Sequence, residues 1–137
     1  MKASTVYFRN IVAILAITLI FISCKKPAGE GGKSSIKGTL WAEDWNGSFT
    51  VKNGEYAAYD EDVYIIYGDA VSYSDKTKSN YNGEYEFKYL RKGKYKIYVY
   101  SKDKTLTSPS GDVSIVKEVE ITEKKGVKTV DQIIIYK

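Results

Sequence analysis

Apolar residues occupy every second position through much of the chain, and this spacing constrains the fold more than any other feature. It occurs in stretches separated by turn residues, at positions 36–40, 63–67, 84–88, 95–100, 113–121 and 133–135. Successive side chains of a strand point to opposite faces, so the alternation is typical of half-buried strands. No segment sustains the ~3.6-residue period of an amphipathic helix. The pattern therefore predicts an all-β domain.

Turn-forming dipeptides divide these stretches. Asn46-Gly47, Asn53-Gly54 and Asn82-Gly83 favour the positive φ of tight hairpin turns, and Lys92-Gly93 and Lys125-Gly126 mark two further turns. The stretches then form seven or eight short strands, in a segment about as long as an immunoglobulin-like domain. The sequence therefore predicts a seven- to eight-stranded antiparallel β-sandwich.

A central motif resembles the signature of a known superfamily. Residues 80–99 read NYNGEYEFKYLRKGKYKIYV. This stretch is similar to the pattern of the carboxypeptidase-regulatory-like and Cna-B-like domains, which have a transthyretin-like β-sandwich fold. The matching positions are Gly83, Tyr85, Phe87, Leu90, Gly93, Tyr95, Ile97 and Val99, and Asn80 replaces the usual aspartate. The resemblance implies this fold and a non-catalytic role, since the superfamily supplies accessory, spacer, adhesive and carbohydrate-binding modules.

The alternation within this motif assigns side chains to the two faces of its strands. We expect Tyr85, Phe87, Tyr95 and Ile97 to be buried, and Glu86, Lys96 and Tyr98 to be exposed. A slip of one residue in register would reverse every one of these assignments. The burial of these residues therefore tests the strand assignment directly.

Residues 1–23 have the form of a secretory signal peptide. Lys2 and Arg9 supply its positive charge, and the apolar run Ile11–Ile22 falls short of the ~20 residues that a membrane-spanning helix needs. An uncleaved membrane anchor is the alternative interpretation. The one cysteine, Cys24, follows this run directly, and the sequence FISC resembles the lipobox of bacterial lipoproteins.

The lipobox resemblance implies that Cys24 is lipidated and becomes the new N-terminus; a chance free cysteine is the alternative. Residues 24–34 contain three glycines and no large apolar side chain, so we expect a flexible tether before a folded domain at residues 35–137. Lys25 differs from the aspartate associated with inner-membrane retention. We therefore expect a lipid anchor in the cell envelope, at the outer membrane, with either leaflet possible.

The composition excludes several classes of function. The chain has no histidine and one cysteine, so it lacks the commonest general base and cannot form an internal disulfide or a thiolate zinc cluster. The net charge is +4, or +2 without Lys2 and Arg9, far from the basic footprint of a nucleic-acid-binding protein. We expect no enzymatic activity, no cofactor and no nucleic-acid partner.

The acidic residues suggest three possible sites, each with a simpler interpretation. Asp60-Glu61-Asp62 could bind Ca²⁺, but adjacent carboxylates on an extended chain cannot all face one ion, so we expect a solvated turn. Two carboxylates could form a glycosidase pair, although no motif singles out any two. Lys37 and Asp131 could form the isopeptide bond of some Cna-B-like domains, but an unlinked sandwich is expected.

Aromatic residues provide the candidate binding site. The chain has 13 tyrosines, more than a small core can easily bury. The residues expected to face outward and bind a ligand are Trp41, Trp45, Tyr64, Tyr98 and Tyr100. An exposed strip of such rings can stack on sugars, because axial C–H groups meet the π-face. The alternative is that the rings form ordinary cross-strand pairs, each worth ~0.2–1 kcal/mol.

These observations predict a lipid-anchored, non-catalytic binding or accessory module of the cell envelope, with a glycan as the favoured ligand. The alternative is a structural or interaction subunit of an envelope or adhesion complex that docks through a sheet edge. An exposed aromatic patch would favour the first function, and a long uncharged edge strand would favour the second.

Overall fold

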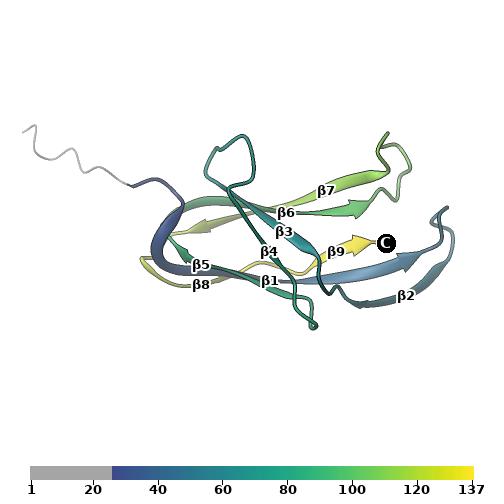
Figure 1. Cartoon of the computed structure of the whole chain (residues 1–137), viewed down its shortest axis with the longest axis horizontal. Helices are drawn as coiled ribbons and strands as arrows, with labels where there is room; N and C mark the ends of the chain where they lie inside the picture. The colour runs from purple at the N-terminus through teal and green to yellow at the C-terminus, as the bar shows by residue number, and fades with distance from the viewer. Residues whose placement is uncertain (1–25) are drawn as a thin grey trace, which may run out of the picture.

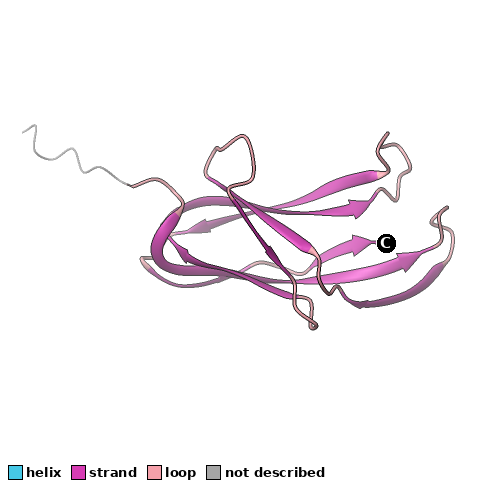
Figure 2. Cartoon of the chain, viewed as in Figure 1, coloured by secondary structure: helices cyan, strands magenta, loops and turns pink. Residues whose placement is uncertain are grey.

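The computed structural model describes residues 26–137, which form nine strands and contain no helix that could span a membrane (Figures 1 and 2). The strands are β1 (Glu30–Trp45), β2 (Lys52–Ala57), β3 (Asp62–Tyr67), β4 (Asp75–Lys78), β5 (Glu84–Leu90), β6 (Gly93–Lys102), β7 (Asp112–Ile121), β8 (Lys125–Thr129) and β9 (Ile133–Tyr136). The predicted all-β sandwich is confirmed, with nine strands where seven or eight were expected. The predicted signal peptide and Cys24 lie outside the described residues.

The strands form two layers (Figure 1). One sheet has the order β4-β3-β6-β7, and all its pairs are antiparallel. The other sheet is built around β1, which pairs with β5 and β2 along one edge and with β8 and β9 along the other. β8 and β9 run parallel to β1, so the predicted antiparallel arrangement is wrong for these two strands. This direction follows because β7 ends near the start of β1, so β8 enters the sheet at the end where β1 begins.

The core lies between the sheets and takes its side chains from alternate strand positions. Its buried members are Ile36, Leu40, Ala42, Ala58, Val63, Ile65, Tyr85, Phe87, Leu90, Tyr95, Ile97, Val99, Ile121, Val130, Ile133 and Ile135. The predicted burial of Tyr85, Phe87, Tyr95 and Ile97 is therefore confirmed.

The predicted exposure of Glu86, Lys96 and Tyr98 is wrong in degree. All three alternate with core residues and lie on the outer faces of the sheets, but each is half-buried. Neighbours on the same face cover them: Lys37 and Lys88 lie 3.7 and 3.5 Å from the Glu86 carboxylate. Glu86 is thus partly covered by its neighbours on the outer face.

The N-terminal segment corrects the predicted tether at residues 24–34. The strand β1 begins at Glu30, and Ala28 already packs against the core. The Gly29 N–H donates a hydrogen bond to Tyr95 Oη (3.0 Å), and the Arg91 N–H donates one to the Gly29 carbonyl (2.8 Å). The glycines here permit close packing, because a Cβ on Gly32 would overlap the Leu90 carbonyl. The ordered domain therefore begins before Ser35.

The turn dipeptides have mixed outcomes. Asn46-Gly47 does join the antiparallel strands β1 and β2. Asn53-Gly54 lies inside β2 and Lys125-Gly126 lies inside β8, so neither is a turn. Asn82-Gly83 connects strands of different sheets, with Gly83 at φ 74° and the Leu40 N–H donating to its carbonyl. Lys92-Gly93 likewise connects strands of different sheets, β5 and β6, so Asn46-Gly47 is the one predicted turn dipeptide of the five that lies in a hairpin.

Candidate functional site

Four tyrosines gather on the outer surface of the four-stranded sheet, which we call the tyrosine face. Tyr64 comes from β3, Tyr98 and Tyr100 come from β6, and Tyr73 comes from the loop after β3. The outward direction of Tyr64, Tyr98 and Tyr100 follows from the pleat, because the residues beside them in the strands (Val63, Ile65, Ile97 and Val99) are buried between the sheets. The Tyr73 ring packs edge-on against Tyr64. Three of the five aromatic residues predicted from sequence are therefore brought together.

The rings of the tyrosine face have two different roles. Tyr64 and Tyr98 are register partners whose rings stack at 4.9 Å between centroids and 12° between planes. Stacking places one face of each ring against the other ring, where a ligand cannot reach it. Tyr100 lies edge-on to both, at 5.8 and 5.7 Å, and Tyr73 lies edge-on to Tyr64 at 5.2 Å. Tyr100 and Tyr73 remain 55% and 52% exposed, so these two rings are the ones available to a ligand.

Polar groups border the tyrosine face. The Tyr64 hydroxyl donates a hydrogen bond to Asp62 Oδ2 (3.3 Å), and Lys76 Nζ lies 3.4 Å from the same oxygen. Burial raises the pKa of the Tyr64 and Tyr98 hydroxyls, so both stay protonated near neutral pH. The face therefore combines aromatic surface with neutral hydroxyls, one carboxylate and one ammonium group.

Trp41 lies on the opposite side of the molecule. Its neighbours Leu40 and Ala42 are fully buried, so Trp41 points outward from the five-stranded sheet. It is half-buried there, between its register partners Ala57 of β2 and Ile134 of β9. Trp41 and the tyrosine face cannot contact one small ligand together.

Trp45 belongs to a third place, the end of the sandwich where β1 finishes. Its ring lies 6.5 Å from that of Phe49, which lies 6.2 Å from Tyr136. Lys104 Nζ lies 3.9 Å from the Trp45 ring centroid, a cation–π contact that covers this face of the indole. The Trp45 Nε1–H donates to Glu43 (3.0 Å), and this bond, with Lys52 nearby, lowers the pKa of Glu43. Trp45 therefore packs and caps this end.

A buried carboxylate holds Lys104 in place. Asp103 is 4% exposed and accepts hydrogen bonds from the backbone N–H groups of Thr105, Thr107 and Ser108, at 2.8, 2.8 and 2.7 Å. The Thr105 hydroxyl donates a further bond (2.5 Å). These donors lower the pKa of Asp103 far below its usual range. Asp103 thus fixes the shape of the β6–β7 loop that carries Lys104.

Sequence reasoning missed several exposed tyrosines. Tyr73 lies in the β3–β4 loop, where no alternation exists to assign it to a face. Tyr59 and Tyr81 lie in separate loops, yet their rings stack at 4.1 Å and 7° while remaining 48% and 79% exposed. The high number of tyrosines was the signal available in the sequence. Residues in loops do not alternate between two faces, so their contacts could not be inferred from their positions in the sequence.

The acidic candidates do not assemble into sites. Asp60 and Glu61 face Lys78 (2.8 Å) and Lys137 (2.7 Å), while Asp62 faces Lys76, so the three carboxylates point to three lysines. Within residues 26–137, no group of three potential metal ligands comes together. Lys37 lies on the outer face beside Glu86, and Asp131 is exposed. Neither has the burial that the isopeptide interpretation requires.

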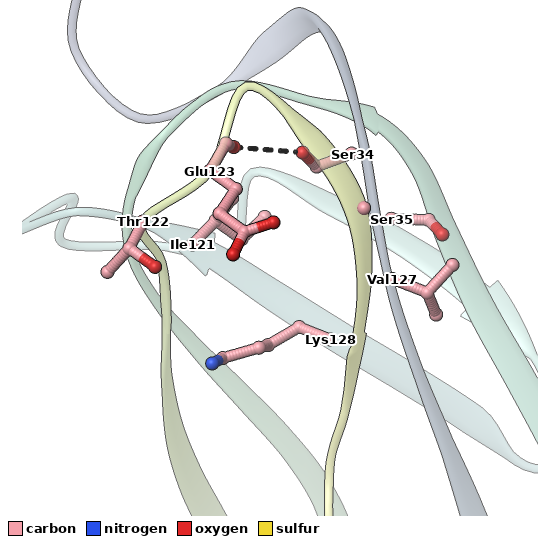
Figure 3. Close-up of a pocket in the computed structure, with 8 residues that line it drawn as sticks. Ser34, Ser35, Ile121, Thr122, Glu123, Val127 and Lys128 are labelled. Carbon is pink, nitrogen blue, oxygen red and sulfur yellow. Dashed lines mark hydrogen bonds between the residues drawn. The ribbon is translucent and has the colours of Figure 1, made fainter.

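The clearest hollow in the described domain is small. Figure 3 shows it between the start of β1 and the β7–β8 turn, with the Ser34 hydroxyl donating a hydrogen bond to the Glu123 carbonyl (3.1 Å). Its volume is about 120 Å³, below the ~300–1,000 Å³ usual for small-molecule pockets. Four larger hollows, of about 390 to 450 Å³, also lie on the described domain, but each is more open than this one. A ligand of ordinary size would therefore bind on an open surface.

The chain matches no protein-family model and no curated protein. Its structure is similar to the crystal structure of a Pseudomonas aeruginosa protein described as a "putative carbohydrate binding protein", with a TM-score of 0.46 and 11% sequence identity. The similarity covers 80% of this chain and 92% of that chain. At this distance, the likeness does not indicate what this chain binds.

Proposed function

We propose that this chain is a lipid-anchored, non-catalytic module of the cell envelope that binds an oligosaccharide on the tyrosine face. The observation that carries the proposal is the arrangement of the four rings. The stacked pair Tyr64 and Tyr98 supports two half-exposed rings, Tyr73 and Tyr100, at the surface. A purely structural cross-strand pair would not need these two additional aromatic side chains.

The chemistry of the face suits a sugar. Axial C–H groups of a pyranose ring can pack on an exposed tyrosine ring, while its hydroxyls exchange hydrogen bonds with tyrosine hydroxyls and with Asp62 and Lys76. The open surface suits an extended oligosaccharide better than a single small molecule. Neutral tyrosine hydroxyls can both donate and accept, which matches the dual character of sugar hydroxyls.

The anchor and the family are parts of the same proposal. Cys24 directly follows an apolar run in a sequence that resembles a lipobox. The motif positions at Tyr85, Phe87, Tyr95 and Ile97 supply core side chains, which supports membership of the carboxypeptidase-regulatory-like superfamily. Together these features support a folded module held at the outer membrane by acyl chains on Cys24.

Docking through a sheet edge is less well supported. β7 is the longest strand at an edge of the four-stranded sheet, but it carries Asp112, Lys117, Glu118 and Glu120. The other edge strand of this sheet, β4, has the sequence DKTK. Charged residues, lysine above all, are the usual protection of an edge against pairing with another strand. The outer face of the four-stranded sheet therefore carries the binding function better than the edges of that sheet.

A glycan array tests the ligand. The mature chain from Cys24 onward should bind at least one oligosaccharide, and Tyr73→Ala with Tyr100→Ala should weaken binding about tenfold or more. Tyr81→Ala removes a more exposed ring elsewhere and should leave binding unchanged. Binding that is absent, or indifferent to the double variant, would contradict the glycan function.

The anchor has its own test. Mass spectrometry of the chain purified from membranes should show acyl chains on Cys24 and no residues before it. Cys24→Ser should leave the precursor unprocessed or release the protein from the membrane fraction. A Cys24→Ser variant that fractionates and migrates like the wild type would refute the anchor.

A further inference from the structure

Basic side chains gather at the end of the sandwich where the described chain begins, which we call the basic end. Pairing of Glu30 with Leu90, of Gly93 with Ile121 and of Lys33 with Lys125 brings the neighbouring turns to this one end (Figure 1). The cations placed there are Lys26, Lys33, Arg91, Lys92, Lys94, Lys124 and Lys125. The carboxylates nearby are Glu30, Asp69, Asp75, Glu120 and Glu123, so the basic end has an excess of two positive charges.

None of these seven cations forms an ion pair with another described residue. The Arg91 guanidinium lies against Gly29, while Lys92, Lys124 and Lys125 are exposed. Opposite charges at a protein surface usually offset one another locally. Here the positive charges are left available to an external anion.

The opposite end of the sandwich has a different charge arrangement. There Lys52 pairs with Glu43 and Glu55, Lys102 with Asp112, and Lys137 with Glu61. The remaining lysine, Lys104, lies over Trp45. Asp44 and Asp103 also lie at this end, so its carboxylates outnumber its lysines. The two ends of the molecule thus differ in the sign of their net charge and in how far their lysines are neutralised.

The distance to the proposed anchor places the basic end near lipid. Cys24 precedes Ala28, the first described residue that packs against the core, by four positions. A chain extends at most ~3.6 Å per residue, so these four positions reach no farther than ~14 Å. Acyl chains on Cys24 would hold the basic end within roughly one to two Debye lengths of the headgroups at ~0.1 M salt.

We infer that the basic end lies on an anionic lipid surface, so that the sandwich stands upright with its Trp45 end directed away from the membrane. This inference rests on the lipid anchor of the proposed function. Lysines and arginine near anionic headgroups add to membrane attraction, and the acidic residues of the opposite end oppose a reversed orientation. In this orientation the tyrosine face lies on the flank of the domain and remains open to an extended ligand.

Vesicle partitioning tests the inference without the anchor. The mature chain with Cys24→Ser is incubated at ~0.1 M salt with vesicles of phosphatidylcholine alone or mixed with phosphatidylglycerol. We expect at least about tenfold stronger partitioning into the anionic vesicles. Lys92→Glu, Lys124→Glu and Lys125→Glu together should abolish this preference. The matched control, Lys96→Glu, Lys104→Glu and Lys117→Glu, makes the same change in net charge away from the basic end and should retain most of it.

The outcomes separate this inference from the proposed function. No preference for anionic vesicles, or equal loss in both triple variants, would overturn the basic end as a lipid-binding surface. Acylation of Cys24 and glycan binding are measured independently and can stand without it. Circular dichroism checks that the variants fold. If the triple Glu variant does not fold, the triple variant Lys92→Gln, Lys124→Gln and Lys125→Gln replaces it. We expect this variant to partition into anionic vesicles about threefold more weakly than the chain without these substitutions. Unchanged partitioning of that folded variant would also overturn the inference.

Discussion

Gly38 and Tyr85 are register partners across β1 and β5, and the Tyr85 hydroxyl occupies the space in which a side chain at residue 38 would begin. Gly38→Ala should therefore force the buried Tyr85 ring to move and cost about 1–3 kcal/mol of unfolding free energy. Urea denaturation measures the loss. Gly54→Ala is the matched control, because Gly54 also lies in a strand but has open space around it. Equal stability of the two variants would contradict the close packing of Gly38 against Tyr85.

The Tyr85 hydroxyl also predicts a pH dependence. Burial raises its pKa from 10.0 to about 12. An unfolded tyrosine ionises near pH 10 while the folded one does not, so this contribution to stability is complete below pH 10 and is lost as the pH rises toward 12. Burial raises the pKa of Tyr95 as well, which acts in the same direction.

Between the two pKa values, ionisation of one tyrosine in the unfolded chain lowers the free energy of unfolding by roughly 1.4 kcal/mol per pH unit. Tyr85→Phe should remove this contribution to the alkaline loss of stability. At neutral pH it should be neutral or stabilising, because the Tyr85 hydroxyl has no hydrogen-bond partner among the described residues. Thermal unfolding between about pH 8 and about pH 11.5 measures both effects. The same alkaline slope in wild type and variant would show that Tyr85 does not carry this dependence.

The attachment of the N-terminal segment depends on Tyr95. Its hydroxyl accepts a hydrogen bond from Gly29 N–H (3.0 Å) and donates one to the Arg91 carbonyl (2.6 Å). Tyr95→Phe should cost about 1–2 kcal/mol and should speed hydrogen exchange at the Gly29 amide. Exchange at core amides such as Ile97 serves as the internal control. Unchanged exchange at Gly29 would mean that other contacts hold the segment.

The β6–β7 loop should depend on Asp103. Asp103→Ala removes the acceptor of at least four hydrogen bonds and should release Lys104 from Trp45. We expect a change in tryptophan fluorescence and a loss of about 1–3 kcal/mol of stability. Asp112→Ala removes an exposed carboxylate near the same loop and should have a much smaller effect. Similar spectra for both variants would contradict a specific role for Asp103.

The strand faces could be predicted because alternation is a local property of the sequence. Polar residues alternate with Tyr85, Phe87, Tyr95 and Ile97, and this alternation correctly predicted that the four side chains are buried. Outward direction of Tyr64, Tyr98 and Tyr100 followed from the same rule, although their mutual contact depends on the pairing of β3 with β6, which alternation does not specify.

Other features depend on contacts between distant parts of the chain. The segment before Ser35 looks like a linker by composition, yet its glycines allow it to pack beside Leu90, Arg91 and Tyr95. The bulge between Asp44 and Trp45 shifts the register of β1 against β2. Alternation along the sequence therefore does not predict that Trp45 lies apart from Trp41. Tyr73 lies in a loop, where only the folded chain brings it to Tyr64.

NMR titration of the mature chain with an oligosaccharide from the array locates ligand binding most directly. Ring resonances of Tyr73 and Tyr100 should shift most, with smaller shifts for the stacked pair Tyr64 and Tyr98. Resonances of Tyr59, Tyr81 and Trp41, which lie elsewhere, should remain in place and serve as internal controls. Shifts confined to Trp45, Phe49 and Tyr136, or no shifts at saturating oligosaccharide, would contradict binding on the tyrosine face.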